Sequence, residues 1–84
     1  MDEERFNQAC QLRDDGKFEE SFREFINIAN DTDDPNDKAA AILYAAVCLK
    51  MLRDWERARQ QLDIARLLIA ESNLASGNSD EREW

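Results

Sequence analysis

Apolar residues recur every three or four positions in four successive segments of the chain, which is the spacing of amphipathic helices. The first segment places Phe6, Ala9 and Cys10 on one helical face, with Arg13 one turn further on. This helix should end near Gly16, because glycine adopts the left-handed conformation of a helix cap without steric cost. A helix is therefore predicted over the opening residues of the chain.

A second helix should start directly after this glycine. Glu19 and Glu20 occupy its first turn, where the helix dipole favours acidic side chains. Its apolar face is wider than that of the first helix and contains Phe18, Phe22, Phe25, Ile26 and Ala29. The short stretch GKFEESF at 16–22 therefore predicts that one helix ends and the next begins, as in a helical hairpin.

The stretch NDTDDPND at 30–37 interrupts the pattern and predicts the start of a third helix. Asp34 is expected as its N-cap and Pro35 at its first position, with Asp37 in the first turn. The helix then continues through KAAAILYAAVCLKML, where many small residues permit close approach of neighbouring helices. Its packing face is Ile42, Ala45, Ala46 and Leu49, with Leu43, Val47 and Met51 beside it.

A second stop and restart, within RDWERARQQLDIA, predicts a fourth helix. Its expected inward stripe is Trp55, Ala58, Leu62, Ala65 and Ile69. Loop residues are predicted from Ser72 onward, and residues 76–84 are expected to form a polar tail or the start of a capping helix. The ending DEREW at 80–84 echoes DEERF at 2–6, so the tail has the look of a third helical start.

A shift of 37 residues brings the two halves of the sequence into register. The matched pairs include Ala9 with Ala46, Leu12 with Leu49, Phe18 with Trp55, Ser21 with Ala58 and Phe25 with Leu62. Matches concentrate at positions that helix packing requires and disappear elsewhere, as at Phe22 against Arg59, which is how a structural repeat diverges. The sequence therefore predicts an all-α domain in which one two-helix unit is used twice.

This pattern resembles the tetratricopeptide repeat (TPR) family over about residues 3–72. The matching positions are Ala9, Leu12, Gly16, Phe18, Ser21 and Phe25 in the first unit, and Ile42, Ala45, Ala46, Leu49, Ala58, Leu62 and Ala65 in the second. Arg5 and Gln8 depart from the Trp and Leu that the family prefers. The 37-residue register also exceeds the family's repeat of about 34 residues, so a longer loop is expected between the units. An unrelated four-helix bundle is the alternative.

The resemblance implies antiparallel helix–turn–helix pairs, stacked as a short right-handed superhelix over 1–75, with units at about 2–34 and 37–72. It also implies a protein-binding role, in which the first helix of each unit lines a concave groove. The groove positions carried over from the family are Phe6, Cys10, Arg13, Leu43, Val47 and Lys50. An apolar floor edged by two cations suits a helical or extended apolar segment with a nearby acid. The alternative is that these side chains only pack within the domain or against another copy.

The fourth helix is apolar on more than one face, which is unusual for a helix that covers a single core. Ile64, Leu67 and Leu68 lie at helical angles away from its inward stripe. A folded-back tail with Leu74 and Trp84, a second copy of the chain or a different protein would cover this surface. Our hypothesis is a homodimer, because an uncovered helix face that meets its own symmetry mate forms a closed assembly.

Charge and composition narrow the class of partner. The 84-residue chain has a formal net charge of −8, which argues against nucleic-acid phosphates and anionic membrane surfaces. No apolar stretch reaches the roughly 20 residues of a membrane span, and the start MDEERF lacks the features of a signal peptide. Cys10 and Cys48, both within helical patterns, indicate a reducing compartment and not a disulfide scaffold. We therefore expect a cytoplasmic protein.

No residue pattern points to catalysis. The chain has no histidine, so neither a Ser–His nor a Cys–His pair exists. A reactive Cys10 near Arg13 is less favoured than a buried, inert thiol. The run DTDDPND resembles a calcium loop but has Asn36 and Ile42 where glycine and glutamate are needed. We expect a non-catalytic interaction module without cofactor or metal. A dedicated small chaperone or adaptor is the alternative, and an enzyme is a distant one.

Overall fold

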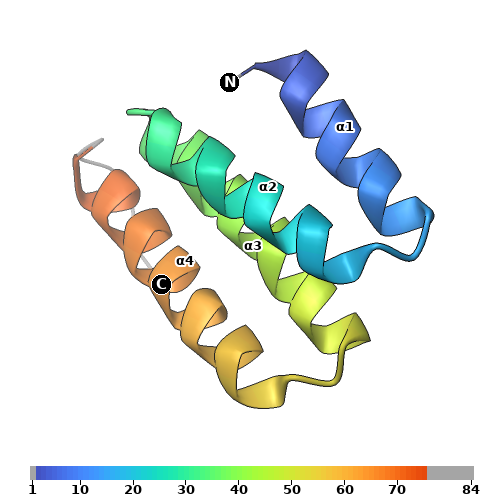
Figure 1. Ribbon diagram of the computed structural model, residues 1–84. Coiled ribbons are helices and arrows are strands. Elements are labelled where there is room, and N and C mark those ends of the chain that lie inside the picture. Colours follow the sequence, from blue (N-terminus) through green and yellow to red (C-terminus); the bar gives the residue numbers. More distant parts are fainter. Residues whose placement is uncertain (1, 76–84) are drawn as a thin grey trace.

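The computed structural model describes residues 2–75, with side-chain exposure through Glu71, and this part of the chain contains four α-helices and no β-strand. The helices are α1 (Glu3–Asp14), α2 (Phe18–Asp31), α3 (Pro35–Met51) and α4 (Trp55–Ala75). Successive helices run in opposite directions (Figure 1). α1 packs against α2, and α3 packs against both α2 and α4. The expected all-α architecture of packed helical hairpins is therefore confirmed.

Aspartate side chains mark the starts of α1, α3 and α4. The carboxylate of Asp2 accepts hydrogen bonds from two backbone N–H groups in the first turn of α1. Asp34 accepts one from the N–H of Asn36 at 2.8 Å, with Pro35 at the first position of α3, as the sequence predicts. Asp54 accepts one from the N–H of the third residue of α4. Each cap satisfies donors that have no partner within the helix, so these boundaries follow from local sequence.

The two helical hairpins close with the same backbone hydrogen bonds, displaced by 37 residues. The bonds run from the N–H of Gly16 to Arg13 and of Lys17 to Leu12 in the first hairpin, and from Arg53 to Lys50 and Asp54 to Leu49 in the second, all at 2.9–3.0 Å. Gly16 and Arg53 both have positive φ. Because donors, acceptors and backbone conformation all repeat, the register found in the sequence is also the register of the structure.

The core lies where α3 packs against α2 and α4. Its buried members are Ala9, Phe25, Ile28, Ala29, Ala39, Ala41, Ile42, Ala45, Cys48 and Ala65. Most of these are alanines, so the helix axes approach closely, and Phe25 supplies the largest fully buried side chain. Two pairs of positions related by the repeat share their burial: Ala9 and Ala46 are both fully buried, as are Ser21 and, to within 2%, Ala58.

A short chain of buried hydrogen bonds joins the first three helices. The hydroxyl of Ser21 on α2 donates to the carbonyl oxygen of Ala9 on α1 at 2.6 Å. The Sγ of Cys48 on α3 donates to the same hydroxyl at 3.3 Å. Burial raises the pKa of the Cys48 thiol, so it stays protonated at neutral pH. The structure thus gives this cysteine a packing role.

Two expectations about lengths are wrong. The loop between the units is not extended, because only residues 32–34 separate α2 from α3. The extra residues are helical instead: α1 begins at 3, whose counterpart is 40, yet α3 already begins at 35. Asp34 and Pro35 start the helix early and so convert the extra residues into an additional turn. Likewise, Ser72 does not begin a loop, because α4 continues to Ala75.

The prediction that Trp55 and Ile69 point inward is also wrong. Their side chains are 62% and 40% exposed, although Ala58 and Ala65 are buried as expected. The reason is positional: α3 packs beside α2 in the first unit, whereas no described helix occupies the same side of α4. The predicted tail at 76–84 lies outside the described residues, as do the side chains proposed to fold back onto α4.

Candidate protein-binding surface

The solvent side of α3 carries an apolar stripe. Its residues are Ala40, Leu43, Tyr44, Val47 and Met51, which follow the spacing of one helical face. Leu43 and Val47 are each 39% exposed, and Met51 is 57% exposed. The first four residues of the stripe line an apolar hollow of about 320 Å³. Single exposed apolar residues are ordinary on a protein surface, but a continuous stripe with a hollow is typical of a binding surface.

Tyr44 forms the rigid part of this stripe. Its ring stacks on Phe25 with centroids 5.4 Å apart, and the edge of Phe6 approaches it at 4.9 Å. The guanidinium of Arg13 lies over the same ring, 5.7 Å from its centroid. A ring held on three sides loses little freedom when a ligand binds, which favours affinity. Because Phe6 and Arg13 belong to α1, this cluster also connects α1 to the α3 stripe.

Two cations lie in the last turns of the helices that carry this surface. Arg13 is in the last turn of α1 and Lys50 in the last turn of α3, so they occupy equivalent places in the two units. Arg13 reaches the carboxylate of Asp14 at 3.7 Å, whereas Lys50 is exposed and pairs with no acid among residues 2–75. The helix dipole favours positive charge at both places. A partner's carboxylate bound here gains an ammonium group that has no competing acid within residues 2–75.

The predicted groove residues differ in exposure between the two helices. Phe6, Cys10 and Arg13 are half-buried on α1, while Leu43, Val47 and Lys50 are exposed on α3. Cys10 packs against the core and contributes little accessible surface. The apolar spacing of the sequence does not single out Tyr44, which lies between the buried and exposed sides of α3; its only signal is an aromatic residue beside Leu43. We call Phe6, Cys10, Arg13, Leu43, Tyr44, Val47 and Lys50 the α1–α3 face.

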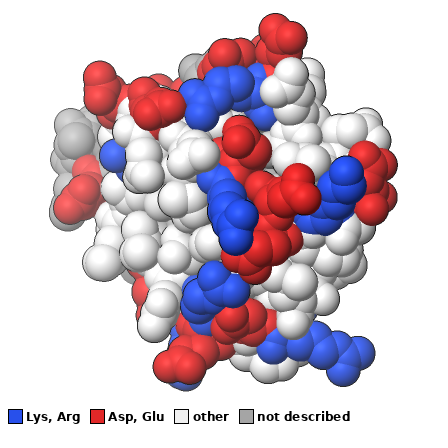
Figure 2. Space-filling view, viewed as in Figure 1, with Lys and Arg blue, Asp and Glu red and all other residues white. Residues whose placement is uncertain are grey.

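The surface proposed for self-association is only partly exposed. Ile64 and Leu67 are 43% and 67% exposed, and Leu67 with Ala70 borders a hollow of about 410 Å³. Leu68 is different from what was expected, because it is half-buried and packs against the core. It follows Ala65 by three residues and therefore lies on the packed side of α4. Figure 2 shows uncharged surface over α4 beside a band of charged side chains.

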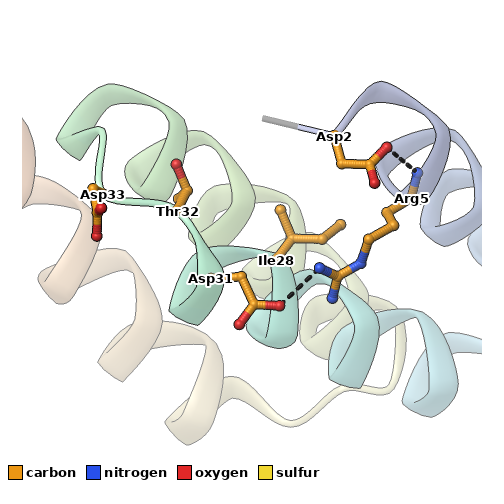
Figure 3. A pocket seen from close by; sticks show the side chains of 6 residues that line it. All are labelled: Asp2, Arg5, Ile28, Asp31, Thr32 and Asp33. Atoms are coloured by element: carbon orange, nitrogen blue, oxygen red, sulfur yellow. Dashed lines mark hydrogen bonds and ion pairs between the residues drawn. The ribbon is translucent and has the colours of Figure 1, made fainter.

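A polar hollow of about 300 Å³ lies between the start of α1 and the end of α2 (Figure 3). The Nη1 of Arg5 donates to the carboxylate of Asp31 at 2.7 Å across it, and this bond raises the pKa of Arg5. The carboxylate of Asp2, on the opposite side, caps α1. Arg5, Asp31 and Asp2 already have partners in this hollow, and Arg5 is half-buried whereas the two aspartates are exposed. The ion pair between Arg5 and Asp31 therefore links α1 to α2. Arg5 is also one of the two residues that differ from the TPR sequence pattern.

The described residues contain two thiols, no cluster of metal-binding side chains and no helix suited to crossing a membrane. No group of three or more His, Cys, Asp or Glu side chains within residues 2–75 is arranged to hold a metal ion. Cys10 and Cys48 are both free thiols. None of the described helices combines the length and apolar character needed to cross a membrane. Among the described residues, the apolar stripe of α3 with its hollow is the candidate site for docking.

Comparison with known proteins identifies neither a family nor a relative of this chain. No family model matches the chain, and neither a curated protein nor a solved structure is detectably similar to it.

Proposed function

We propose that this protein is a non-catalytic interaction module that binds an apolar segment of another protein on the α1–α3 face. The observation that carries the proposal is the hollow beside Tyr44, where Leu43 and Val47 remain exposed although they are large and apolar. Covering such side chains is favourable by about 25 cal/mol for each Å² of apolar surface removed from water. The resemblance of the spacing to the TPR family supports the same role.

The chemistry of the face indicates what the bound segment contains. One apolar side chain enters the hollow between Leu43 and Val47 and rests on the ring of Tyr44. The phenolic hydroxyl of Tyr44 makes no hydrogen bond with residues 2–75 and can donate to a backbone carbonyl. A carboxylate follows near Arg13 and Lys50. The expected ligand is therefore a helix or extended strand that combines apolar residues with an acidic one.

A peptide selection tests this proposal. The immobilised protein is screened against a displayed library of short random peptides, and the enriched peptides are then measured individually. We expect them to pair an aromatic or aliphatic residue with Asp or Glu. Val47→Asp should weaken their binding at least tenfold, a change of about 1.4 kcal/mol, because it places a charge in the hollow. Gln8→Asp, on the exposed side of α1, is the matched control and should leave binding unchanged.

Enriched peptides without an acidic residue, or binding that survives Val47→Asp, would contradict the proposed site. The runner-up role, a small chaperone dedicated to one partner, uses the same face. It differs in selectivity, because a dedicated chaperone discriminates sharply among related apolar peptides, whereas a general module accepts many of them. The spread of affinities among enriched peptides separates the two roles.

A further inference from the structure

The outward side of α4 carries a second stripe that the proposed function does not use. Trp55, Arg59, Leu62, Arg66 and Ile69 follow the i, i+4, i+7, i+11 and i+14 spacing of one helical face. Trp55 is 62% exposed, Ile69 is 40% exposed and Leu62 is half-buried. The two arginines between them are exposed. We call these five residues the outer stripe of α4.

The repeat supplies an internal comparison for this stripe. The residues 37 positions earlier are Phe18, Phe22, Phe25, Ala29 and Thr32 on α2. Phe25 and Ala29 are buried, and Phe18 and Phe22 pack against the core. α3 packs along this helix: Tyr44 stacks on Phe25, and Cys48 hydrogen bonds to Ser21. The same stripe is therefore covered in the first unit and open in the second.

The helix that covers α2 is α3, and it does so with a row of small residues. Cys48 meets α2, and the buried residues Ala41 and Ala45 precede it at the spacing of the same helical face. Small side chains at these three positions let the backbone of α3 approach the bulky phenylalanines of α2. A helix that covers Trp55 and Leu62 in the same manner needs a similar row of small residues.

The outer stripe differs from its counterpart in charge. Arg59 replaces Phe22 and Arg66 replaces Ala29. Arg59 forms no ion pair with residues 2–75, and Arg66 reaches Asp63 only at 3.8 Å, with both side chains largely exposed. Such exposed pairs contribute little and leave the guanidinium free to bind elsewhere. A helix docked here therefore gains from carboxylates beside its row of small residues.

We infer that the outer stripe of α4 docks a helix of a different protein, one that has small residues along one face and acidic residues flanking them. The apolar residues of the stripe provide the contact, and Arg59 and Arg66 select the charge of the partner. This surface lies on a different helix from the α1–α3 face, so one module holds two partners or two segments of one partner.

A second copy of this chain does not fit the stripe. Continuing the repeat would place α1 of another copy there, and its residues equivalent to Ala41, Ala45 and Cys48 are Glu4, Gln8 and Gln11. Burying these polar side chains without partners is unfavourable. A symmetric pairing of two α4 helices about Leu62 fails for another reason, because it sets arginines of the stripe against arginines of the other copy.

Trp55 provides a local probe of docking. The chain has two tryptophans, so Trp84→Phe leaves Trp55 as the only one. The protein is titrated with a synthetic alanine-rich helical peptide that has Ala at i, i+4 and i+7 flanked by glutamates. The matched control peptide carries lysines in place of those glutamates. Trp55 emission should shift to shorter wavelength and saturate with the glutamate peptide, while the lysine peptide should bind at least tenfold more weakly.

A preference for the glutamate peptide over the lysine peptide is a strict test of the stripe. The net charge of −8 on the whole protein attracts the lysine peptide and repels the glutamate peptide. Only the local arginines can reverse the order. Replacing both with Arg59→Glu and Arg66→Glu should exchange the preference between the two peptides, with helix content unchanged by circular dichroism. Val47→Asp, which disables the α1–α3 face, should leave the Trp55 response intact.

Several outcomes overturn the inference. Emission already at short wavelength in dilute protein alone would mean that the chain covers its own stripe. A shift that follows protein concentration without peptide would assign the stripe to a second copy. Equal affinity for both peptides, a preference for the lysine peptide or no response to either would contradict docking of an acidic helix on this stripe.

Discussion

Gly16 and Arg53 occupy the same place in the two hairpins, and both adopt left-handed backbone conformations, with φ of +84° and +62°. A glycine takes this conformation without steric cost, whereas an arginine does not, because its Cβ approaches the backbone. The second hairpin therefore has the geometry of the first without the residue best suited to it. The turn geometry, and not its sequence, is what the two hairpins share.

The turn geometry predicts opposite effects of two exchanges. Arg53→Gly should raise the free energy of unfolding by about 0.5 kcal/mol, because relief of the left-handed strain exceeds the added entropy of the unfolded chain. Gly16→Ala should lower it by about 1 kcal/mol, although the space around Gly16 is open, because φ remains positive. Urea unfolding followed by circular dichroism measures both. Equal effects of the same sign would contradict this account of the turns.

The buried hydroxyl of Ser21 should contribute to stability. Ser21→Ala removes the 2.6 Å bond to the carbonyl of Ala9 and leaves the Cys48 thiol without its acceptor. The expected loss is about 1 kcal/mol in the free energy of unfolding, the usual value for a buried hydrogen bond. Ser21→Val should cost more, because it adds volume at a fully buried position as well as removing the hydroxyl. Asn27→Ala, at an exposed position on α2, is a control that should have little effect.

Asp54 should make stability depend on pH in the acid range. Hydrogen bonds from Arg57 lower the pKa of this carboxyl group in the folded protein. The unfolded state then binds the proton more readily, so the stabilisation is present above about pH 4 and is lost as the pH falls through the lowered pKa. Asp54→Asn retains a capping side chain but removes the titration.

The measurement is urea unfolding at a series of pH values. Between neutral pH and the acid range, the Asp54→Asn protein should lose less stability than the wild type. Asp33→Asn, at an exposed aspartate outside the helix caps, should follow the wild-type curve. Parallel curves for the wild type and Asp54→Asn would show that the contact with Arg57 has no energetic consequence in solution.

Self-association, if it occurs through α4, should depend on Ile64 and Leu67. These residues lie on a different side of α4 from the outer stripe and expose 43% and 67% of their surface. Light scattering behind a sizing column, over a wide concentration range, should show a dimer that Ile64→Glu with Leu67→Glu converts to a monomer, because buried glutamates are strongly disfavoured. Gln8→Glu, at an exposed position on α1 away from this surface, tests whether added charge alone has this effect. A wild-type monomer at every concentration would remove the homodimer hypothesis.

The first helices of the two units illustrate what local sequence specifies. Asp34 and Pro35 lie at the start of α3 as predicted, because a cap and a fixed proline φ act within a few residues. The 37-residue register was also visible, since both hairpins need small residues where helices approach. The length of the loop between the units was misjudged, because a shift in register shows how many residues are added but not whether they are helical.

The fourth helix illustrates the opposite case. Leu68 and Trp55 exchanged their expected roles: Leu68 packs against the core and Trp55 faces solvent. The apolar residues of α4 extend around too wide an arc of the helix for their spacing to define one inward direction. Tyr44 was missed for a related reason, because its value comes from rings contributed by two other helices.

The sequence by itself determined the four helices within residues 2–75, the start of α3 at Asp34 and Pro35 and the repetition of one hairpin, because these features depend on interactions within a few residues. Only the tertiary structure decided which side of α4 is covered, where the rings around Tyr44 meet and which apolar residues stay open to partners. Those properties depend on the positions of neighbouring helices, and burial is a relation between elements that no single segment contains.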